Sequence, residues 1–427
     1  MSTTDSRSPG ASGDANPAST GLVGQGRGPA GWDHLFGEEH HALRRSIRDW
    51  VTRELRPHVQ AWEDAEWVPS SVFRRLGETG FAATPYPVEL GGQGGDHLTD
   101  AIWTEEIARS GSGGLAAALS APTTIATPPI LKFGTPEQQE RWVPPVLRGE
   151  RVAALAITEP GTGSDVAGIL TRAERVEGGF RVNGEKCFIT GGVRAQHYVT
   201  AVRTTQDGGH DGISFLVVER GPEPEGAEDD PALLGADRGD GISASPIEKL
   251  GWHASDTALV SFQDVFVPED HLLGELHGGF KLIMANFGWE RLSMALGAVA
   301  GMDLAFEQTC AYVAQRRAFG RRIADFQGTR WALAEIGMEI EAARSLTYET
   351  LRRHVAGEQV IREVSMAKLQ TQRTAVDVID RCLQLHGGAG YTKEQGLERA
   401  WRDARLGPIG GGTDEIMKDV IGRLMGC

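Results

Sequence analysis

The feature that most constrains the fold of this 427-residue chain is a long apolar stripe in its last third. Its members are three or four residues apart, the spacing that places side chains on one face of an α-helix: Leu292, Leu296, Val299, Met302, Phe306, Cys310 and Val313. The same spacing recurs within 333–343 and 369–383. Several long helices of this kind bury their stripes against one another. We therefore expect a helical bundle over residues 269–427.

The middle of the chain has the pattern of a β-domain. Short runs rich in β-branched and aromatic residues at 198–202, 213–218 and 258–262 predict strands. The pair Asn183-Gly184 predicts a hairpin turn, because this dipeptide suits a tight two-residue turn. The acidic, Gly- and Pro-rich segment 221–246 is expected to form a mobile surface loop. Together these features predict a small barrel or sandwich over residues 151–268.

The first third divides into a polar tail and a helical region. Residues 1–31 have almost no apolar side chain to bury, so we expect a disordered tail. Residues 32–150 show helical spacing, and Thr135-Pro136 predicts a helix start because proline suits the first helical position. The predicted fold class is α+β, with an all-α domain (32–150), a β-domain (151–268) and a bundle (269–427).

Composition excludes several classes of function. The net charge is −15, and nucleic acids and anionic membranes require a basic surface, so we expect neither as a partner. No apolar run approaches the roughly 20 residues of a membrane-spanning helix. The four cysteines lie far apart without CxxC spacing, which argues against a zinc site or a disulfide scaffold. We expect a cytoplasmic protein without a metal.

Five segments contain residues suited to binding a ligand, and each also has a purely structural explanation. Segment 156–165 is a glycine-rich turn that exposes backbone N–H groups, or an ordinary β-turn. Segment 188–192 contains an aromatic ring and a hydroxyl group, which are suited either to binding a ligand or to packing in the core. An arginine pair in 316–320 is suited either to binding a phosphate group or to a favourable interaction with the dipole at a helix C-terminus. Glycines in 384–391 and 408–416 permit close approach of a ligand, or cap helices.

Taken in this order, the five segments resemble the acyl-CoA dehydrogenase family over about residues 32–426, apart from the loop at 221–246. The resemblance implies a helical N-terminal domain, a central β-barrel, a C-terminal four-helix bundle and FAD held between them. It also implies a homotetramer or homodimer, because part of each FAD site comes from a neighbouring subunit.

The resemblance also assigns residues to the cofactor. Ile157 and Thr158 are implied at the pyrimidine edge of the flavin, and Ser164 at the flavin or the thioester ligand. Phe188 and Thr190 are implied at the flavin face and N5, although many relatives have Trp where this chain has Phe188. The remaining positions implied to bind FAD are Arg316, Phe319, Gln327, Gln384, Gly387, Gly388, Thr413 and Glu415, of which the first reach across the subunit interface.

The base that removes the α-proton needs separate reasoning. Many relatives place a Glu directly before Gly-Thr in the fifth segment, where this chain has Gly411. Glu290 is a replacement, and it resembles the branch of long-chain and isovaleryl-CoA dehydrogenases, which keep Gly there and use an earlier Glu. The structural alternative is an acid at the start of the first bundle helix, stabilised by the helix dipole. If it is the base, burial beside the ligand is expected to raise its pKa from about 4.3 toward neutrality.

The expected reaction is FAD-dependent dehydrogenation of an acyl-CoA thioester to trans-2-enoyl-CoA, with hydride transfer to flavin N5 and electrons passed to an electron-transfer flavoprotein. The backbone N–H of Gly411 is implied to bind the thioester carbonyl, and Ser164, Arg291 and Gly412 to contact the substrate. Arg291 equally suits a structural ion pair. The alternatives are a dehydrogenase acting on a carrier-protein thioester, a flavin monooxygenase and a non-catalytic flavoprotein. Glu290 argues against the monooxygenase.

Overall fold

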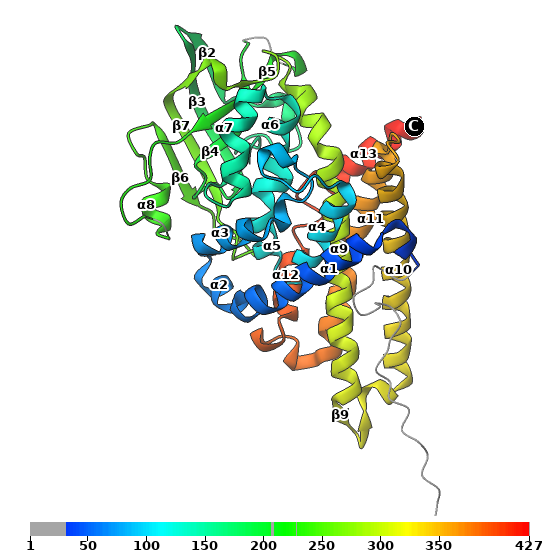
Figure 1. The fold of residues 1–427 in the computed structure, drawn as a ribbon. Helices are drawn as coiled ribbons and strands as arrows, with labels where there is room; N and C mark the ends of the chain where they lie inside the picture. Colours follow the sequence, from blue (N-terminus) through cyan, green and yellow to red (C-terminus); the bar gives the residue numbers. More distant parts are fainter. Residues whose placement is uncertain (1–30, 206–208, 228, 427) are drawn as a thin grey trace, which may run out of the picture.

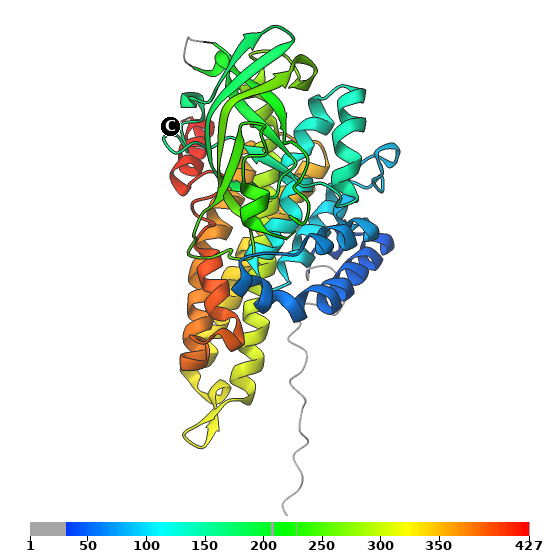
Figure 2. The ribbon, with the colours of Figure 1, turned by 90° about the vertical axis from the view of Figure 1, so that its left-hand side faces the viewer.

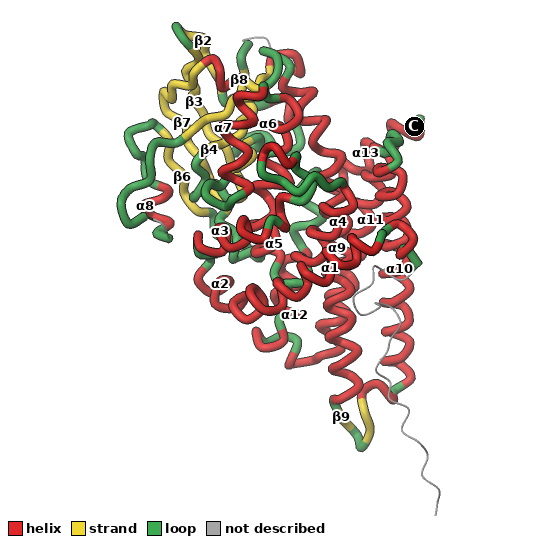
Figure 3. The backbone as a smooth tube through the Cα atoms, in the orientation of Figure 1, coloured by secondary structure: helices red, strands yellow, loops and turns green. Residues whose placement is uncertain are grey.

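The computed structural model describes residues 31–205, 209–227 and 229–426, so the predicted tail lies outside the described residues except for Gly31. Helices, then a sheet, then long helices follow one another along the chain, which confirms the predicted α+β fold (Figures 1 and 3). The N-terminal helices are α1 (Glu38–Trp50), α2 (Val59–Ala65), α3 (Ser70–Thr79), α4 (His97–Ala108), α5 (Gly113–Ala121), α6 (Pro128–Phe133) and α7 (Pro136–Leu147).

Caps and buried ion pairs fix these helices. Helix α7 begins as predicted, with Thr135 and Gln138 forming a capping box before Pro136. Helix α1 is tied to α4 by Arg44, whose guanidinium lies 2.5 Å from Glu105 and 3.0 Å from Glu106. All three side chains are buried, so each charge depends on its partners. Across the described residues, no helix combines the length and apolarity needed to cross a membrane.

The middle region is one eight-stranded sheet in the order β6-β7-β3-β2-β4-β5-β8, with β1 parallel to β4. Strands β5 and β7 are not paired but are in contact, so the sheet curls around its own apolar core. The strands are β1 (Ala153–Ala156), β2 (Arg172–Val176), β3 (Gly179–Thr190), β4 (His197–Arg203), β5 (Ile213–Glu219), β6 (Ile242–Pro246), β7 (Thr257–Pro268) and β8 (Leu272–Leu273).

The predicted turn at Asn183-Gly184 is wrong, because both residues lie inside β3. Gly184 has φ +148°, and a side chain there would lie 2.6 Å from the Cα of Thr171. The pairing of β3 with β7 changes register at this point, so the glycine makes a bulge. The turn between β2 and β3 is instead Glu177-Gly178, where Gly178 has φ +78°.

The predicted loop at 221–246 is also wrong in part, because it contains helix α8 (Pro231–Gly235) and strand β6. Arg220, buried at the end of β5, donates hydrogen bonds to the carbonyls of Leu234 at 2.6 Å and Ile242 at 3.1 Å. A buried arginine that satisfies several carbonyls holds this segment against the sheet. Acidic residues also hold the segment in place, since Asp240 accepts from the N–H groups of Gly221 at 2.7 Å and Ile242 at 3.0 Å.

The C-terminal region contains the predicted bundle, whose long helices extend past the sheet to a small hairpin at the tip (Figures 1 and 2). In the apolar stripe of α9, Val299, Met302 and Phe306 pack against α10 and α11, whereas Leu292 and Leu296 pack in the core of the N-terminal helices. The elements are α9 (Gly279–Gln315), β9 (Arg317–Ala318), β10 (Arg321–Arg322), α10 (Gln327–Val355), α11 (Ile361–His386), α12 (Leu397–Ala404) and α13 (Asp414–Met425).

Candidate active site

Glu290 lies in the interior of α9 and not at its start, because the helix already begins at Gly279. The prediction that Glu290 opens the first bundle helix is therefore wrong. The favourable effect of a helix N-terminus on an acid acts within the first turn. The helix dipole consequently gives no structural reason for an acid at this position.

The carboxyl group of Glu290 is held without a hydrogen-bond partner. Its Oε2 atom is buried and accepts no hydrogen bond from the residues that the structure describes. Burial raises the pKa of Glu290 to about 7, although the positive charges of Arg291 and Lys368 act in the opposite direction. A carboxyl whose pKa is near neutrality takes up and releases a proton at physiological pH.

Gly411 brings the backbone between α12 and α13 up to this carboxyl group. A Cβ atom at Gly411 would lie 3.9 Å from Glu290 Oε1 and only 2.4 Å from the sulfur of Met294. Gly411 has φ +62° and Gly412 has φ +96°, conformations that favour glycine. The structure thus brings Glu290, Gly411 and Gly412 together, and a side chain at Gly411 would collide with α9.

Two cations hold the segment 407–412, which we call the glycine loop. Arg291 donates from Nε to the carbonyl of Gly411 at 3.2 Å. Lys368 of α11 donates from Nζ to the carbonyls of Gly407 at 2.8 Å and Gly412 at 2.6 Å. The loop ends at Thr413, whose hydroxyl caps α13 by accepting from Ile416 N at 3.3 Å, so its structural explanation holds.

A second group of side chains, of which Asp100 is buried, contacts the helical turn that carries Glu290. The indole N–H of Trp289 donates to Asp100 of α4 at 2.6 Å. Burial raises the pKa of Asp100 to about 6. The rings of His97 and His354 lie 4.3 Å and 5.4 Å from the indole. This group has no signal in the sequence, because its members are far apart in the chain and form no motif.

The segments predicted to hold the flavin ring are joined at the end of β3. Cys187 N donates to the carbonyl of Thr158 at 2.8 Å. Lys186, fully buried, donates to the carbonyl of Ile157 at 2.9 Å and lies 2.8 Å from Glu159 Oε1. These contacts fix Ile157 and Thr158 beside the end of the strand that carries Phe188 and Thr190.

The surroundings of this junction fit a flat ligand with polar edges, such as a flavin. Phe188 is 64% exposed and has φ +60°, a conformation seldom found for aromatic residues. A Cβ at Gly161 or Gly163 would meet nothing within 4 Å. The buried hydroxyl of Thr162 has no partner within the described part of the chain. Ser164 is exposed in the same turn.

The residues predicted to bind the dinucleotide half lie at the tip of the bundle. Arg316, Phe319 and Gln327 follow the end of α9 and are exposed, Phe319 by 95%. Gln384, Gly387 and Gly388 end α11 beside them, because Tyr312 of α9 stacks on His386 with ring centres 4.1 Å apart. The tip lies at the opposite end of the molecule from the sheet (Figure 1). One chain therefore does not bring these residues to Phe188. Glu415, exposed in the first turn of α13, belongs to neither group.

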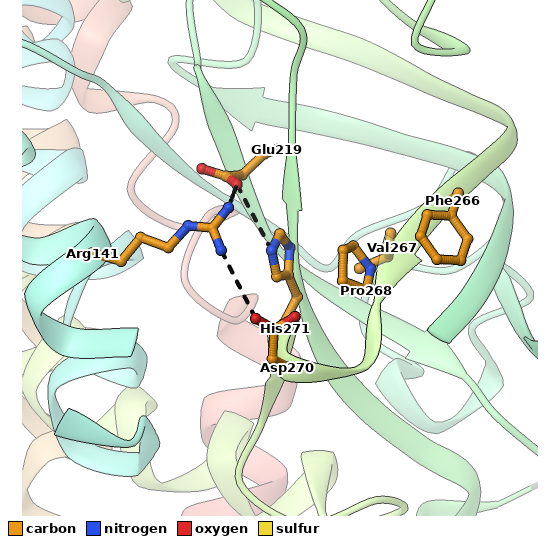
Figure 4. A pocket seen from close by; sticks show the side chains of 7 residues that line it. All are labelled: Arg141, Glu219, Phe266, Val267, Pro268, Asp270 and His271. Carbon is orange, nitrogen blue, oxygen red and sulfur yellow. Dashed lines mark hydrogen bonds and ion pairs between the residues drawn. The ribbon is translucent and has the colours of Figure 1, made fainter. Parts of the chain in front are cut away.

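A pocket of about 480 Å³ lies elsewhere, between α7 and the edge of the sheet (Figure 4). Its charged residues are already paired: Arg141 contacts Glu219 and lies 4.0 Å from Asp270. None of the predicted site residues lines it. The contacts of this pocket join the helical domain to the sheet.

The sequence matches three domain families along its length. These are the acyl-CoA dehydrogenase N-terminal domain over residues 37–150, the middle domain over 154–265 and the C-terminal domain over 277–426. The chain is 36% identical over 392 residues to the mitochondrial long-chain specific acyl-CoA dehydrogenase of Mus musculus, covering 91% of this chain and 87% of that protein. It is 32% identical over 391 residues to the mitochondrial isovaleryl-CoA dehydrogenase of Solanum tuberosum, covering 91% of each.

The fold agrees with these sequence matches. The crystal structure of an acyl-CoA dehydrogenase from Geobacillus kaustophilus superimposes with a TM-score of 0.85 at 37% identity, covering 92% of this chain and 99% of that one. All three domains are thus matched in sequence and in spatial arrangement. The chain belongs to the acyl-CoA dehydrogenase family of FAD-binding oxidoreductases.

Proposed function

We propose that this protein dehydrogenates an acyl-CoA thioester to the trans-2-enoyl thioester, with Glu290 as the base that removes the α-proton. The observation that carries the proposal is the carboxyl of Glu290 beside Gly411, whose buried Oε2 accepts no hydrogen bond from the residues that the structure describes. Its pKa of about 7 suits a group that must be ionised to accept a proton and must hold that proton afterwards.

The neighbouring backbone supplies the second requirement of this reaction. Removal of an α-proton places negative charge on the thioester oxygen, which a fixed N–H donor stabilises. The N–H of Gly411 is the proposed donor, because Arg291 and Lys368 hold the glycine loop by its carbonyls. The family resemblance implies that Ser164, Arg291 and Gly412 contact the substrate, and Arg291 and Gly412 lie at the glycine loop.

When bound, FAD supplies the acceptor for the hydride that leaves the β-carbon. The residues proposed to hold its ring are Ile157, Thr158, Ser164, Phe188 and Thr190. The buried Lys186–Glu159 pair keeps Ile157 in place, so the site is built before the cofactor arrives. Thr413 and Glu415 are proposed to contact FAD at its other end.

The residues at the bundle tip support a homotetramer or homodimer. Arg316, Phe319 and Gln327 are exposed at the bundle tip, which lies at the opposite end of the molecule from the sheet whose strand β3 carries Phe188, so a second copy is proposed to bring them to one cofactor. Gln384, Gly387 and Gly388 lie beside them and are proposed to share this role. We further propose an electron-transfer flavoprotein as redox partner, a role in fatty acid metabolism and a cytoplasmic location.

The experiment is an anaerobic titration of the purified holoenzyme with straight and branched acyl-CoA thioesters. The visible absorbance band of the flavin is monitored during the titration. A parallel series presents the same acyl groups on a carrier protein. We expect at least one acyl-CoA to bleach the flavin band, and we expect the band to recover when electron-transfer flavoprotein is added. Bleaching only by carrier-bound thioesters would replace the proposed substrate class, and bleaching by none would refute dehydrogenation.

A further inference from the structure

Lys368 is a buried lysine within the polar surroundings of Glu290. It lies on the inner face of α11 and its side chain has no solvent exposure. Burying an ammonium group is unfavourable unless it is paired or hydrogen-bonded. Its partners here are backbone carbonyls of the glycine loop, and no carboxylate forms an ion pair with it among the residues that the structure describes.

The two hydrogen bonds of Lys368 reach the first and the last residue of the glycine loop. The ammonium group donates to the carbonyl of Gly407, where the loop begins, and to that of Gly412, where it ends. Hydrogen bonds from a charged donor are about twice as strong as neutral ones. Gln372, one turn later on α11, donates to the carbonyl of Met294 at 2.8 Å, so the same helix face also holds the part of α9 that packs against Gly411.

The charges that act on Lys368 come from the elements around it. Glu290 and Arg291 lie on α9, and Asp414 lies on α13. Burial lowers the pKa of Lys368 to about 8, with Asp414 and Glu290 favouring its charged form and Arg291 opposing it. In return, the charge of Lys368 lowers the pKa of Glu290. Each of the two groups therefore favours the charged form of the other.

We propose that Lys368 is a positioning residue of the reaction: its protonated amine holds the two ends of the glycine loop together, so that Gly411 stays opposite Glu290. This inference rests on the proposed role of Glu290. Lys368 touches neither substrate nor cofactor in this assignment. Two ionisations then limit turnover, because Glu290 must be deprotonated and Lys368 must be protonated.

The test compares the pH dependence of kcat in the holoenzyme and in two variants. The wild-type profile is expected to rise near pH 7 and fall near pH 8. Lys368→Met keeps the length of the side chain but removes both donors and the charge. It is expected to lower kcat about 100-fold, as loss of a positioned group does, to move the rise upward by about one pH unit and to abolish the fall.

Lys368→Arg keeps the charge but does not titrate in this range. It is expected to keep the rise near pH 7 and to lose the fall near pH 8. Lys393→Met removes an exposed lysine that pairs with Asp64 at the surface and serves as the control, with an unchanged profile. Hydrogen exchange of the amides in 407–413 is expected to quicken at least tenfold in Lys368→Met but not in Lys393→Met.

Three results would overturn the inference. These are a fall near pH 8 that survives in Lys368→Met, a kcat in that variant within twofold of wild type, or unchanged exchange in the glycine loop. Glu290→Gln separates this failure from failure of the proposed function. If Glu290→Gln abolishes turnover while Lys368→Met behaves as wild type, only the role of Lys368 is refuted. If Glu290→Gln remains active, the proposed base is wrong.

Discussion

The carboxyl group of Glu290 and the backbone of Gly411 face each other from two separate elements, with 3.9 Å between Glu290 Oε1 and the place where a Cβ at Gly411 would lie. The acid therefore comes from α9 and the close backbone from the glycine loop. A Cβ at 411 would make ordinary van der Waals contact with the carboxyl at 290, but it would overlap the sulfur of Met294.

The overlap with Met294 predicts the effect of Gly411→Ala. A residue with a Cβ is strained at φ +62°, and its Cβ would lie 2.4 Å from the sulfur of Met294. Together, strain and overpacking are expected to lower the free energy of unfolding by about 3 kcal/mol and to reduce kcat. Urea unfolding and steady-state kinetics measure both. Gly422→Ala, in α13 with open space around it, is the control. Equal stability of the two variants would contradict the account.

Asp100 makes stability depend on pH. Burial raises its folded-state pKa to about 6, above its unfolded value of about 3.8, so the folded protein is penalised as pH rises through this interval. Asp100→Asn removes the ionisation and can keep an acceptor for the indole of Trp289. Relative to wild type, the unfolding free energy of the variant is expected to increase by about 2 kcal/mol between pH 4.5 and pH 8. A difference independent of pH would show that Asp100 is not titrating as described.

The buried pair Lys186–Glu159 predicts a link between stability and cofactor retention. Lys186→Met removes the cation that pairs with the buried carboxylate of Glu159, which then keeps only backbone N–H donors, and removes the anchor of the Ile157 carbonyl. The unfolding free energy of the variant is expected to fall by about 3 kcal/mol. The Kd for FAD, measured by flavin fluorescence, is expected to increase at least tenfold. Adding Glu159→Gln is expected to recover stability but not FAD affinity. Recovery of both would mean that the anchor is unimportant.

The bundle and its apolar stripe were predictable because helical periodicity is a local property of the chain. Phe306 and Val313 are buried as their spacing requires. The Asn183-Gly184 turn was mispredicted for the opposite reason. Gly184 is required by the backbone of Thr171, which approaches it across the sheet, and no local pattern contains that contact.

The candidate site could be predicted only for those of its residues that belong to recognisable sequence motifs. Glu290 and Gly411 were singled out by resemblance, and the structure brings them together. Lys368 was missed because a lysine within an amphipathic helix is ordinarily exposed. A signal was present, since position 368 falls on the apolar face with Val364, Ala367 and Ala375. The pairing of Trp289 with Asp100 joins α9 to α4 and has no signal in the sequence.

The most direct test of the central claim is the single-turnover rate of flavin reduction in Glu290→Gln, measured by stopped flow with an acyl-CoA that bleaches the wild type. A positioned base contributes roughly 10²–10⁴-fold, so the account predicts a rate at least 100-fold lower with FAD content unchanged. Glu349→Gln, on the surface of α10, is the control and is expected to reduce at the wild-type rate. Reduction of Glu290→Gln at the wild-type rate would contradict the assignment of Glu290 as the base.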